Sequence, residues 1–371
     1  MSLSVKKIAT FMDPIKTANT IKELIKMHHW VEDNPPSSLS LRQTLTRHTP
    51  LAVTVPLLFY NTYLIQGLTI LGVHINSAEA VEARASEIGE ILREEGIKRN
   101  GIISALCEVW RDEMRDQILK QWPAHDEPAW GQGADAGGLL QQVGAGLLTI
   151  SVRYRITRIE KHTFNERGSK KGDADYYANK GVLLTEIDLG ISSHGNIEIY
   201  STHLFNGGIS NTPPDRERLP RQRKQLNELV QFMKTTHNSS NVAIIVGDFN
   251  IPEYSAGYND LIQLMQQIDM VDLWKKRNGE SGYTSDLLNK SGICSIDRDE
   301  RYCNDLTYND HSNRIDYIFV ERPKRTHCIM VDFTRPRRRP FPRMPGTSEY
   351  NSIKFMSDHV GIETTLVVNP R

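Results

Sequence analysis

The feature that most constrains the fold is a series of apolar, β-rich runs, each of which carries a carboxylate, imidazole or amide near one end. Val, Ile, Tyr and Phe dominate these runs, as is typical of buried strands. A polar group inside such a run costs free energy unless it is paired or bound to a metal. The runs therefore predict strands whose ends converge on one polar centre. They are GIISALCEVW with Glu108, NIEIYSTHLF with His203, NVAIIVGDFN with Asp248 and Asn250, NRIDYIFV with Asp316, and SDHVGIETTLVV with Asp358 and His359.

The order of strand-like and helix-like segments favours two sheets packed face to face with helices outside. Residues 76–100 have helical periodicity, and Asn76 and Glu79 are placed as a capping box. Residues 146–164 and the runs after them are rich in strand formers, with fewer helices between them than a doubly wound parallel sheet requires. The apolar stretch 51–75 is interrupted by Pro, Asn, Gln and His, which predicts a buried strand and a loop rather than a membrane span.

Composition is that of an ordinary globular protein of 371 residues, with 45 Lys plus Arg against 45 Asp plus Glu. We expect an N-terminal extension with a short helix over residues 1–50 and one large domain over 51–371. A formal net charge of zero argues against bulk polyanion as the main partner, so nucleic acid or lipid headgroups would be held by a local patch.

Cysteine usage and the N-terminus both favour a reducing compartment. The four cysteines are scattered, and only Cys294 and Cys303 bracket a polar loop that one disulfide could close in an exported protein. The first 24 residues contain lysines but no apolar run of signal-peptide length, so we expect a cytoplasmic protein without a transmembrane segment.

Taken singly, each polar residue has a simpler explanation. Glu108 or Asp316 alone would more often be an ion-pair partner or a helix cap, and His203 alone a satisfied core histidine. Asn61 alone would be a turn residue, and GDFN could be a type I turn. The joint pattern favours a shared site.

In this order and spacing the chain resembles the endonuclease/exonuclease/phosphatase superfamily of divalent-metal phosphodiesterases, over about residues 51–368. The resemblance implies a four-layer α/β sandwich, two packed mixed β-sheets flanked by helices, with the site at one end of the sheets. It rests on seven motifs: YNTYL with Asn61, LCEVW with Glu108, GLLTIS, STHL with His203, GDFN with Asp248 and Asn250, RIDYIF with Asp316, and SDH with Asp358 and His359.

Within this superfamily the chain looks most like the sphingomyelinase branch, which has phospholipase C type activity. The segment NKG, with Asn179 and Lys180, precedes a strand as is typical there, although a plain turn explains it as well. The chain departs from the family at Cys107, where Gln is common before the metal-binding Glu. Residues 278–310 are polar and show no aromatic membrane-insertion hairpin.

The resemblance implies Glu108, with Asn61 beside it, as metal ligands. Oxygen donors of this kind suit Mg²⁺, with Mn²⁺ or Ca²⁺ as alternatives. His359 is expected to deprotonate the attacking water, oriented by Asp316, whose carboxylate would raise the imidazole pKa. Asp358 is the neighbour of His359 in the motif, and His203 is expected to donate to the phosphoryl group. Asp248 is expected to position water or a second metal, and Asn250 to bond a non-bridging oxygen.

The substrate stays open among three interpretations. Arg338 and the arginines around it (334–345) would grip phosphates of nucleic acid or of an anionic membrane surface equally well, or form a solvated loop. The first interpretation is hydrolysis of sphingomyelin or a related phospholipid, with peripheral membrane contact and with Asn179 and Lys180 binding substrate. The second is a nuclease, and the third is a non-catalytic binding module.

Overall fold

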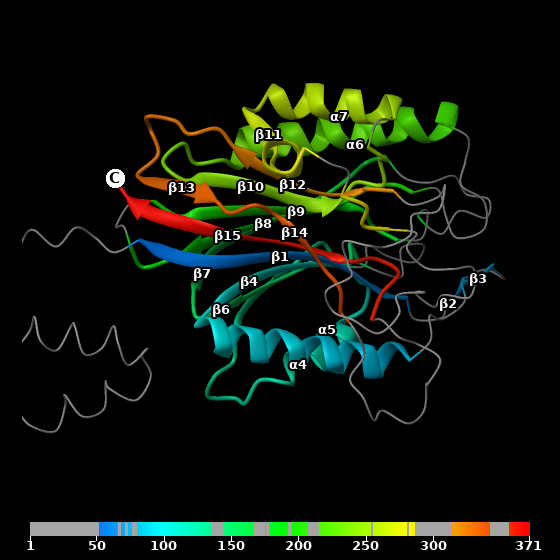
Figure 1. Ribbon diagram of the computed structural model, residues 1–371. Helices are drawn as coiled ribbons and strands as arrows, with labels where there is room; N and C mark the ends of the chain where they lie inside the picture. Colours follow the sequence, from blue (N-terminus) through cyan, green and yellow to red (C-terminus); the bar gives the residue numbers. More distant parts are fainter. Residues whose placement is uncertain are drawn as a thin grey trace, which may run out of the picture. The chain divides into compact units, whose positions relative to one another are not determined.

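Two β-sheets pack face to face between two pairs of helices in the computed structural model of the protein (Figure 1). The structure describes residues 52–65, 68–70, 73–75, 80–135, 144–166, 175, 178–191, 195–206, 215–253, 255–279, 282–285, 313–341 and 356–371. The expected extension over 1–50, the pair Cys294 and Cys303, and most of 278–310 lie outside these residues.

The first sheet contains seven strands. Its order is β13-β15-β1-β4-β6-β5, and β14 pairs with β15. β1 and β4 run parallel, and the other neighbours are antiparallel. The strands are β1 (Val53–Leu64), β4 (Ile102–Val109), β5 (Ala129–Gln132), β6 (Leu148–Val152), β13 (Ile329–Phe333), β14 (Arg337–Arg339) and β15 (Gly361–Pro370).

The second sheet has the order β11-β12-β10-β9-β8-β7, with β9 and β10 parallel. Its strands are β7 (Arg155–Thr163), β8 (Gly181–Asp188), β9 (Ile197–His203), β10 (Val242–Asp248), β11 (Met270–Asp272) and β12 (Asp316–Glu321). A separate hairpin joins β2 (Leu68–Ile70) and β3 (Val73–Ile75).

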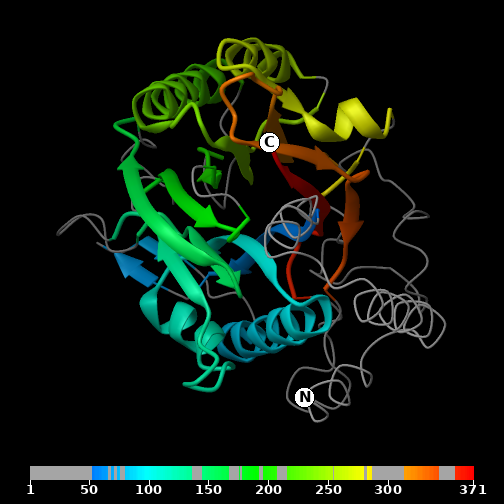
Figure 2. The same cartoon turned by 90° about the vertical axis from the view of Figure 1, so that its left-hand side faces the viewer.

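Helices cover the outer face of each sheet, as Figure 2 shows in a view along the strands. α4 (Val81–Arg99) and α5 (Asp112–Leu119) pack on the first sheet, and α6 (Asp215–Thr236) and α7 (Ala256–Gln266) on the second. The short α8 (Leu273–Arg277) follows β11. One apolar cluster lies between the sheets and one lies under each helix pair, which confirms the expected four-layer sandwich.

One local prediction, the start of the first helix of the domain, was wrong. α4 begins at Val81, with Ala80 as its N-cap, rather than at Asn76. The strand-rich run 146–164 divides into two strands, β6 and β7, which belong to different sheets, and β5 forms around Trp130. The expected buried strand over the start of 51–75 is confirmed as β1. Among the described residues no helix is long and apolar enough to cross a membrane.

The topology brings the polar strand ends together. The parallel pairs β1/β4 and β9/β10 end on the same side, and β12 and β15, which are antiparallel to them, begin there. Asp248 lies directly opposite Asp316 and beside His203 in the sheet register.

Arg314 fixes the start of β12 from inside the protein. Its side chain is fully buried, lies 2.7 Å from Glu253 Oε2 and from Asp272 Oδ2, and stacks on Tyr317 with 4.4 Å between guanidinium carbon and ring centroid. Glu253 also pairs with Lys275, so Asp272 is the buried carboxylate whose charge is balanced mainly by this guanidinium, two residues before Asp316.

We predict that Arg314→Met lowers the free energy of unfolding by about 3–5 kcal/mol, because it leaves the buried carboxylate of Asp272 without its cationic partner. Arg277→Met is the matched control, since Arg277 pairs with Asp332, whose side chain is 75% exposed. It should cost at most about 1 kcal/mol. Urea unfolding of both variants measures the difference, and equal losses would contradict this account of Arg314.

Candidate active site

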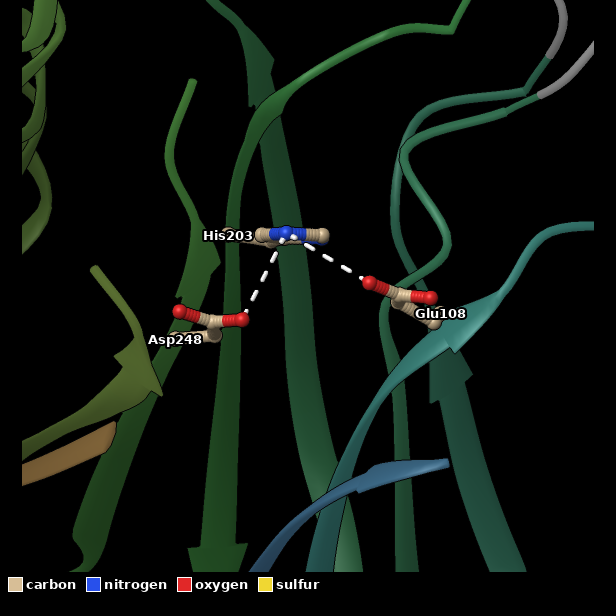
Figure 3. Close-up of side chains that lie close together, drawn as sticks. All are labelled: Glu108, His203 and Asp248. Carbon is tan, nitrogen blue, oxygen red and sulfur yellow. Dashed lines mark ion pairs between the residues drawn. The ribbon is translucent and has the colours of Figure 1, made fainter. Parts of the chain in front are cut away.

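His203 lies between two carboxylates that come from different sheets (Figure 3). Its Nε2 is 3.9 Å from Oε1 of Glu108, on β4, and 3.7 Å from Oδ2 of Asp248, at the end of β10. His203 and Asp248 are almost fully buried. Residues from both sheets thus form one half of a polar centre, and this half consists of Glu108, His203 and Asp248.

Asn61, on β1, joins these two carboxylates. Its Nδ2 donates to Glu108 Oε1 at 3.2 Å and to Asp248 Oδ2 at 3.0 Å, while its Oδ1 accepts a hydrogen bond from the amide of Tyr63 at 3.0 Å. In this arrangement the amide nitrogen of Asn61, rather than its oxygen, faces the carboxylates. Its expected role as a metal ligand stays a prediction.

His359 and Asp316 form the other half of the centre. His359 Nδ1 lies 2.7 Å from Asp316 Oδ2, and His359 Nε2 is 3.9 Å from Asp248 Oδ2. A carboxylate that accepts from Nδ1–H leaves Nε2 as the nitrogen whose lone pair is available when the imidazole is neutral. Asp248 lies between the two histidines and links both halves.

The backbone is held in an uncommon conformation at two of these positions. Glu108 has φ 62° and Asn250 has φ 51°, in the left-handed region that non-glycine residues rarely adopt. Asn250 is stabilised there because its amide donates to Asp248 Oδ1 at 2.9 Å and its Nδ2 to the carbonyl of Leu204 at 3.1 Å. Backbone strain of this kind persists where surrounding contacts enforce it.

Lys180 is buried against His203. Its Nζ lies 2.9 Å from His203 Nε2, 3.2 Å from Asp175 Oδ1 and 5.1 Å from the ring centroid of Trp110. Asn179, the residue before it, donates from Nδ2 to the carbonyl of Asp135 at 2.8 Å. Of the residues expected to bind substrate, Lys180 is the one placed in contact with the centre.

Arg338 lies on β14, where its neighbours are engaged elsewhere. Arg337 and Arg339 both pair with Glu363 at 2.6 Å, and Arg339 also pairs with Glu95 of α4. This part of the basic stretch is tied to the outer face of the first sheet. Contact of Arg338 with substrate stays a prediction.

Arg84 of α4 is a site neighbour that sequence reasoning missed. Its guanidinium donates to the carbonyls of Thr62 and Tyr63 at the end of β1, and to that of Met356 in the segment before Asp358 and His359. Sequence offers one signal for it, an arginine four residues before Ile88 on the buried face of the helix.

Burial and mutual repulsion disturb the ionisation of the centre. Burial raises the pKa of Glu108, with a further increase from Asp358, and it raises the pKa of Asp248 to about 7 together with Asp316. The pKa of Asp358 is also raised by burial.

The two histidines respond in opposite directions. Although burial opposes it, the carboxylates of Asp316, Asp358 and Asp248 raise the pKa of His359 well above its usual value. Burial, the charge of Lys180 and that of His359 hold the pKa of His203 well below the usual value. Such displaced ionisation is typical of functional sites.

The residues fit a divalent cation. Glu108, His203 and Asp248 have ligand atoms close enough for one ion, as do Asp248, Asp316 and His359. Oε2 of Glu108 and Oδ1 of Asp316 are buried without a hydrogen-bond partner among the described residues. Oxygen atoms left in this state, with the carboxylate pKa values raised, indicate missing positive charge at Glu108 and Asp248.

Two curated proteins are similar in sequence, and both carry the name "Putative neutral sphingomyelinase". The one from Caenorhabditis elegans is 27% identical over 237 residues, 60% of this chain and 47% of the relative. The one from Drosophila melanogaster is 25% identical over 282 residues, 71% of this chain and 55% of the relative. The chain spans about half the length of these curated relatives.

Solved structures share the fold. Beta toxin from Staphylococcus aureus, in a structure with bound magnesium ions, has a TM-score of 0.51 and 17% identity, covering 83% of this chain and 98% of the toxin. TDP2 from D. rerio, in complex with a single-stranded DNA product, has a TM-score of 0.54 and 15% identity, covering 84% of this chain and 98% of TDP2.

The family comparison covers the second sheet, the first sheet except for β15 and the start of β1, and all the residues of the centre. Residues 58–359 match the Endonuclease/Exonuclease/phosphatase family, a range that runs from the middle of β1 to His359. With most of the chain matched, and with the two-sheet fold on which the expected motifs converge, the protein belongs to the Endonuclease/Exonuclease/phosphatase family, whose chemistry is of the phosphodiesterase type.

Proposed function

We propose that the protein is a Mg²⁺-dependent phosphodiester hydrolase that cleaves sphingomyelin or a related phospholipid and releases the phosphorylated headgroup. The observation that carries this proposal is the placement of the His359–Asp316 pair opposite Glu108 and His203, with Asp248 between them. The names of the two curated relatives and the Lys180 segment support a lipid substrate.

His359 is the base in this proposal. With its Nδ1–H held by Asp316, Nε2 accepts a proton from the attacking water as the water oxygen bonds to phosphorus. The bond from phosphorus to the lipid alcohol oxygen breaks, its electron pair stays on that oxygen, and the oxygen takes up a proton from solvent. The proton on His359 then returns to solvent.

His203, Asn250 and Lys180 stabilise the phosphoryl group. Because the pKa of His203 is low, the imidazole is neutral and acts as a hydrogen-bond donor rather than as an acid. Lys180, beside it, supplies a positive charge. Asn250, just after β10, has a side-chain amide that donates to the carbonyl of Leu204, and its backbone amide donates to Asp248. Each preorganised donor of this kind is worth about 3 kcal/mol in the transition state.

Glu108, with Asp248 or Asn61, would hold the Mg²⁺ ion, which when bound neutralises the phosphoryl oxygens and stabilises the leaving oxygen. A cation there would also lower the pKa of His359 by charge repulsion and so favour the neutral base. We also propose that the protein contacts the vesicle surface peripherally.

Hydrolysis of DNA is the second candidate function, because TDP2, whose structure holds a single-stranded DNA product, shares the fold. At 15% identity that likeness shows the fold alone. The zero net charge weighs against a nuclease, since nonspecific DNA binding is mainly phosphate neutralisation.

We predict that the purified protein with Mg²⁺ hydrolyses sphingomyelin vesicles, and that Glu108→Gln lowers the rate by about 100-fold or more because a metal ligand is lost. Glu94→Gln, at an exposed position on α4, is the control and should retain the wild-type rate. Calorimetric titration of Mg²⁺ into both variants reports metal binding independently of turnover.

Supercoiled plasmid, an abasic-site duplex and a phosphoinositide complete the substrate panel. Hydrolysis of DNA without lipid hydrolysis would overturn the proposed substrate and favour the nuclease. Mg²⁺ binding without hydrolysis of any of the four substrates would favour a binding module.

We predict that Asp316→Asn lowers kcat by about 10²- to 10⁴-fold, because the amide no longer fixes the imidazole tautomer. The base must be unprotonated, so the rate falls as pH falls through the pKa of His359. Asp316 raises that pKa, and its removal should move the acidic limb of the pH profile to lower pH. Rates of Asp316→Asn and of Asp332→Asn, an exposed control, are compared across pH. An acidic limb that stays in place would refute the pairing of Asp316 with the base.

A further inference from the structure

The helix α6 carries two buried glutamines, Gln222 and Gln225, that bond segments next to the polar centre. α6 covers the second sheet outside β9 and β10 (Figure 1). Gln222 is 1% exposed and Gln225 is fully buried, and both share the apolar face of the helix with Leu226 and Leu229. Polar side chains on such a face need hydrogen-bond partners to offset their burial.

Gln222 bonds two segments that each carry a site residue. Its Nε2 donates to the carbonyl of Phe205 at 2.9 Å and to the carbonyl of Asn250 at 2.8 Å. Phe205 follows His203 by two residues, and Asn250 follows Asp248 by two residues. One amide group therefore connects the exit of β9 with the exit of β10.

The chemistry fixes the orientation of this amide. Both acceptors are carbonyl oxygens, so the NH₂ group must face them, because the opposite orientation would set the Gln222 oxygen against two oxygens. One of these carbonyls belongs to Asn250, whose backbone is left-handed with φ 51°. The hydrogen bond from Gln222 thus acts directly on the strained residue.

Gln225 differs in what it bonds. Its Oε1 accepts from the amide of Phe205 at 2.8 Å, and its Nε2 donates to the carbonyl of Glu166 at 3.0 Å. It holds the exit of β9 as Gln222 does, but its contact with Glu166 leads away from Asn250. Both glutamines are buried and make two hydrogen bonds each, although Oε1 of Gln222 has no partner among the described residues, and they differ in the segments that they join.

We propose that Gln222 is a positioning residue for the phosphodiester centre, setting the separation between His203 at the end of β9 and Asn250 after β10. The proposal rests on the function proposed above, in which these two side chains donate to the phosphoryl group. A shift of either donor weakens transition-state stabilisation more than it weakens ground-state binding.

The test compares Gln222→Met with Gln225→Met, since methionine preserves the length of the side chain and removes its hydrogen bonds. We expect Gln222→Met to lower kcat on sphingomyelin vesicles by about 10- to 100-fold with KM nearly unchanged. Gln225→Met should lower kcat clearly less than Gln222→Met does, because the amide of Gln222 still joins the exits of β9 and β10 in that variant.

A second measurement does not depend on the substrate. Hydrogen–deuterium exchange of the amides around Asn250 should accelerate in Gln222→Met and stay at the wild-type rate in Gln225→Met. Equal exchange around Asn250 in both variants, or equal losses of kcat, would overturn the role assigned to Gln222.

The two measurements separate this proposal from the proposed function. If the wild-type protein hydrolyses no member of the panel, the proposed function fails, and the exchange rates still report whether Gln222 holds Asn250. If wild type is active and Gln222→Met retains its kcat, the positioning role alone is wrong.

Discussion

Buried carboxylates with too little compensating positive charge are the constraint on which the rest of this structure depends. Glu108, Asp248 and Asp316 converge where the two sheets meet, and the pKa values of the first two are raised. The opposite end of the second sheet provides the contrast. There Glu321 is bonded by Lys324 and lies 3.3 Å from His237, and its pKa is lowered to about 2. Burial alone therefore does not explain the raised values.

The sandwich brings these carboxylates together and also holds their segments in place against the repulsion between them. Parallel pairs in both sheets end on the same side, which brings side chains from β4, β9 and β10 together. A carboxylate cluster of this kind would push its segments apart if the backbone were free. Helices on the two outer faces oppose that movement, because Arg84 of α4 bonds the end of β1 and the segment before His359, and Gln222 of α6 bonds the exits of β9 and β10.

The sequence predicted the layers and the convergence of the centre, because a polar residue at the end of a buried strand is visible without the fold. It did not predict the division of 146–164 between two sheets. β6 and β7 have similar composition, and the crossing at Arg153 and Tyr154 depends on pairing partners far along the chain.

Arg84, Gln222 and Arg314 were missed for a related reason. Each is a polar side chain that is buried among apolar ones, and hydrophobic periodicity in the sequence does not predict what such a side chain bonds. The structural role of each side chain depends on the carbonyls or carboxylates that it bonds, and these come from segments distant in sequence. The contact between Lys180 and His203 is also long-range, although the NKG segment had already marked Lys180.

Charge at the centre would couple the binding of a divalent cation to the binding of protons. Asp248, with a pKa of about 7, lies between His203 and His359, so near neutral pH a proton and a divalent cation would compete for the same carboxylate. His359 shares in this competition, because the negative charges that raise its pKa are those that a cation would neutralise. A protonated centre would thus lack both a strong metal site and a neutral base. The zero net charge of the chain conceals this arrangement, since the deficit of positive charge is local to one end of the sandwich.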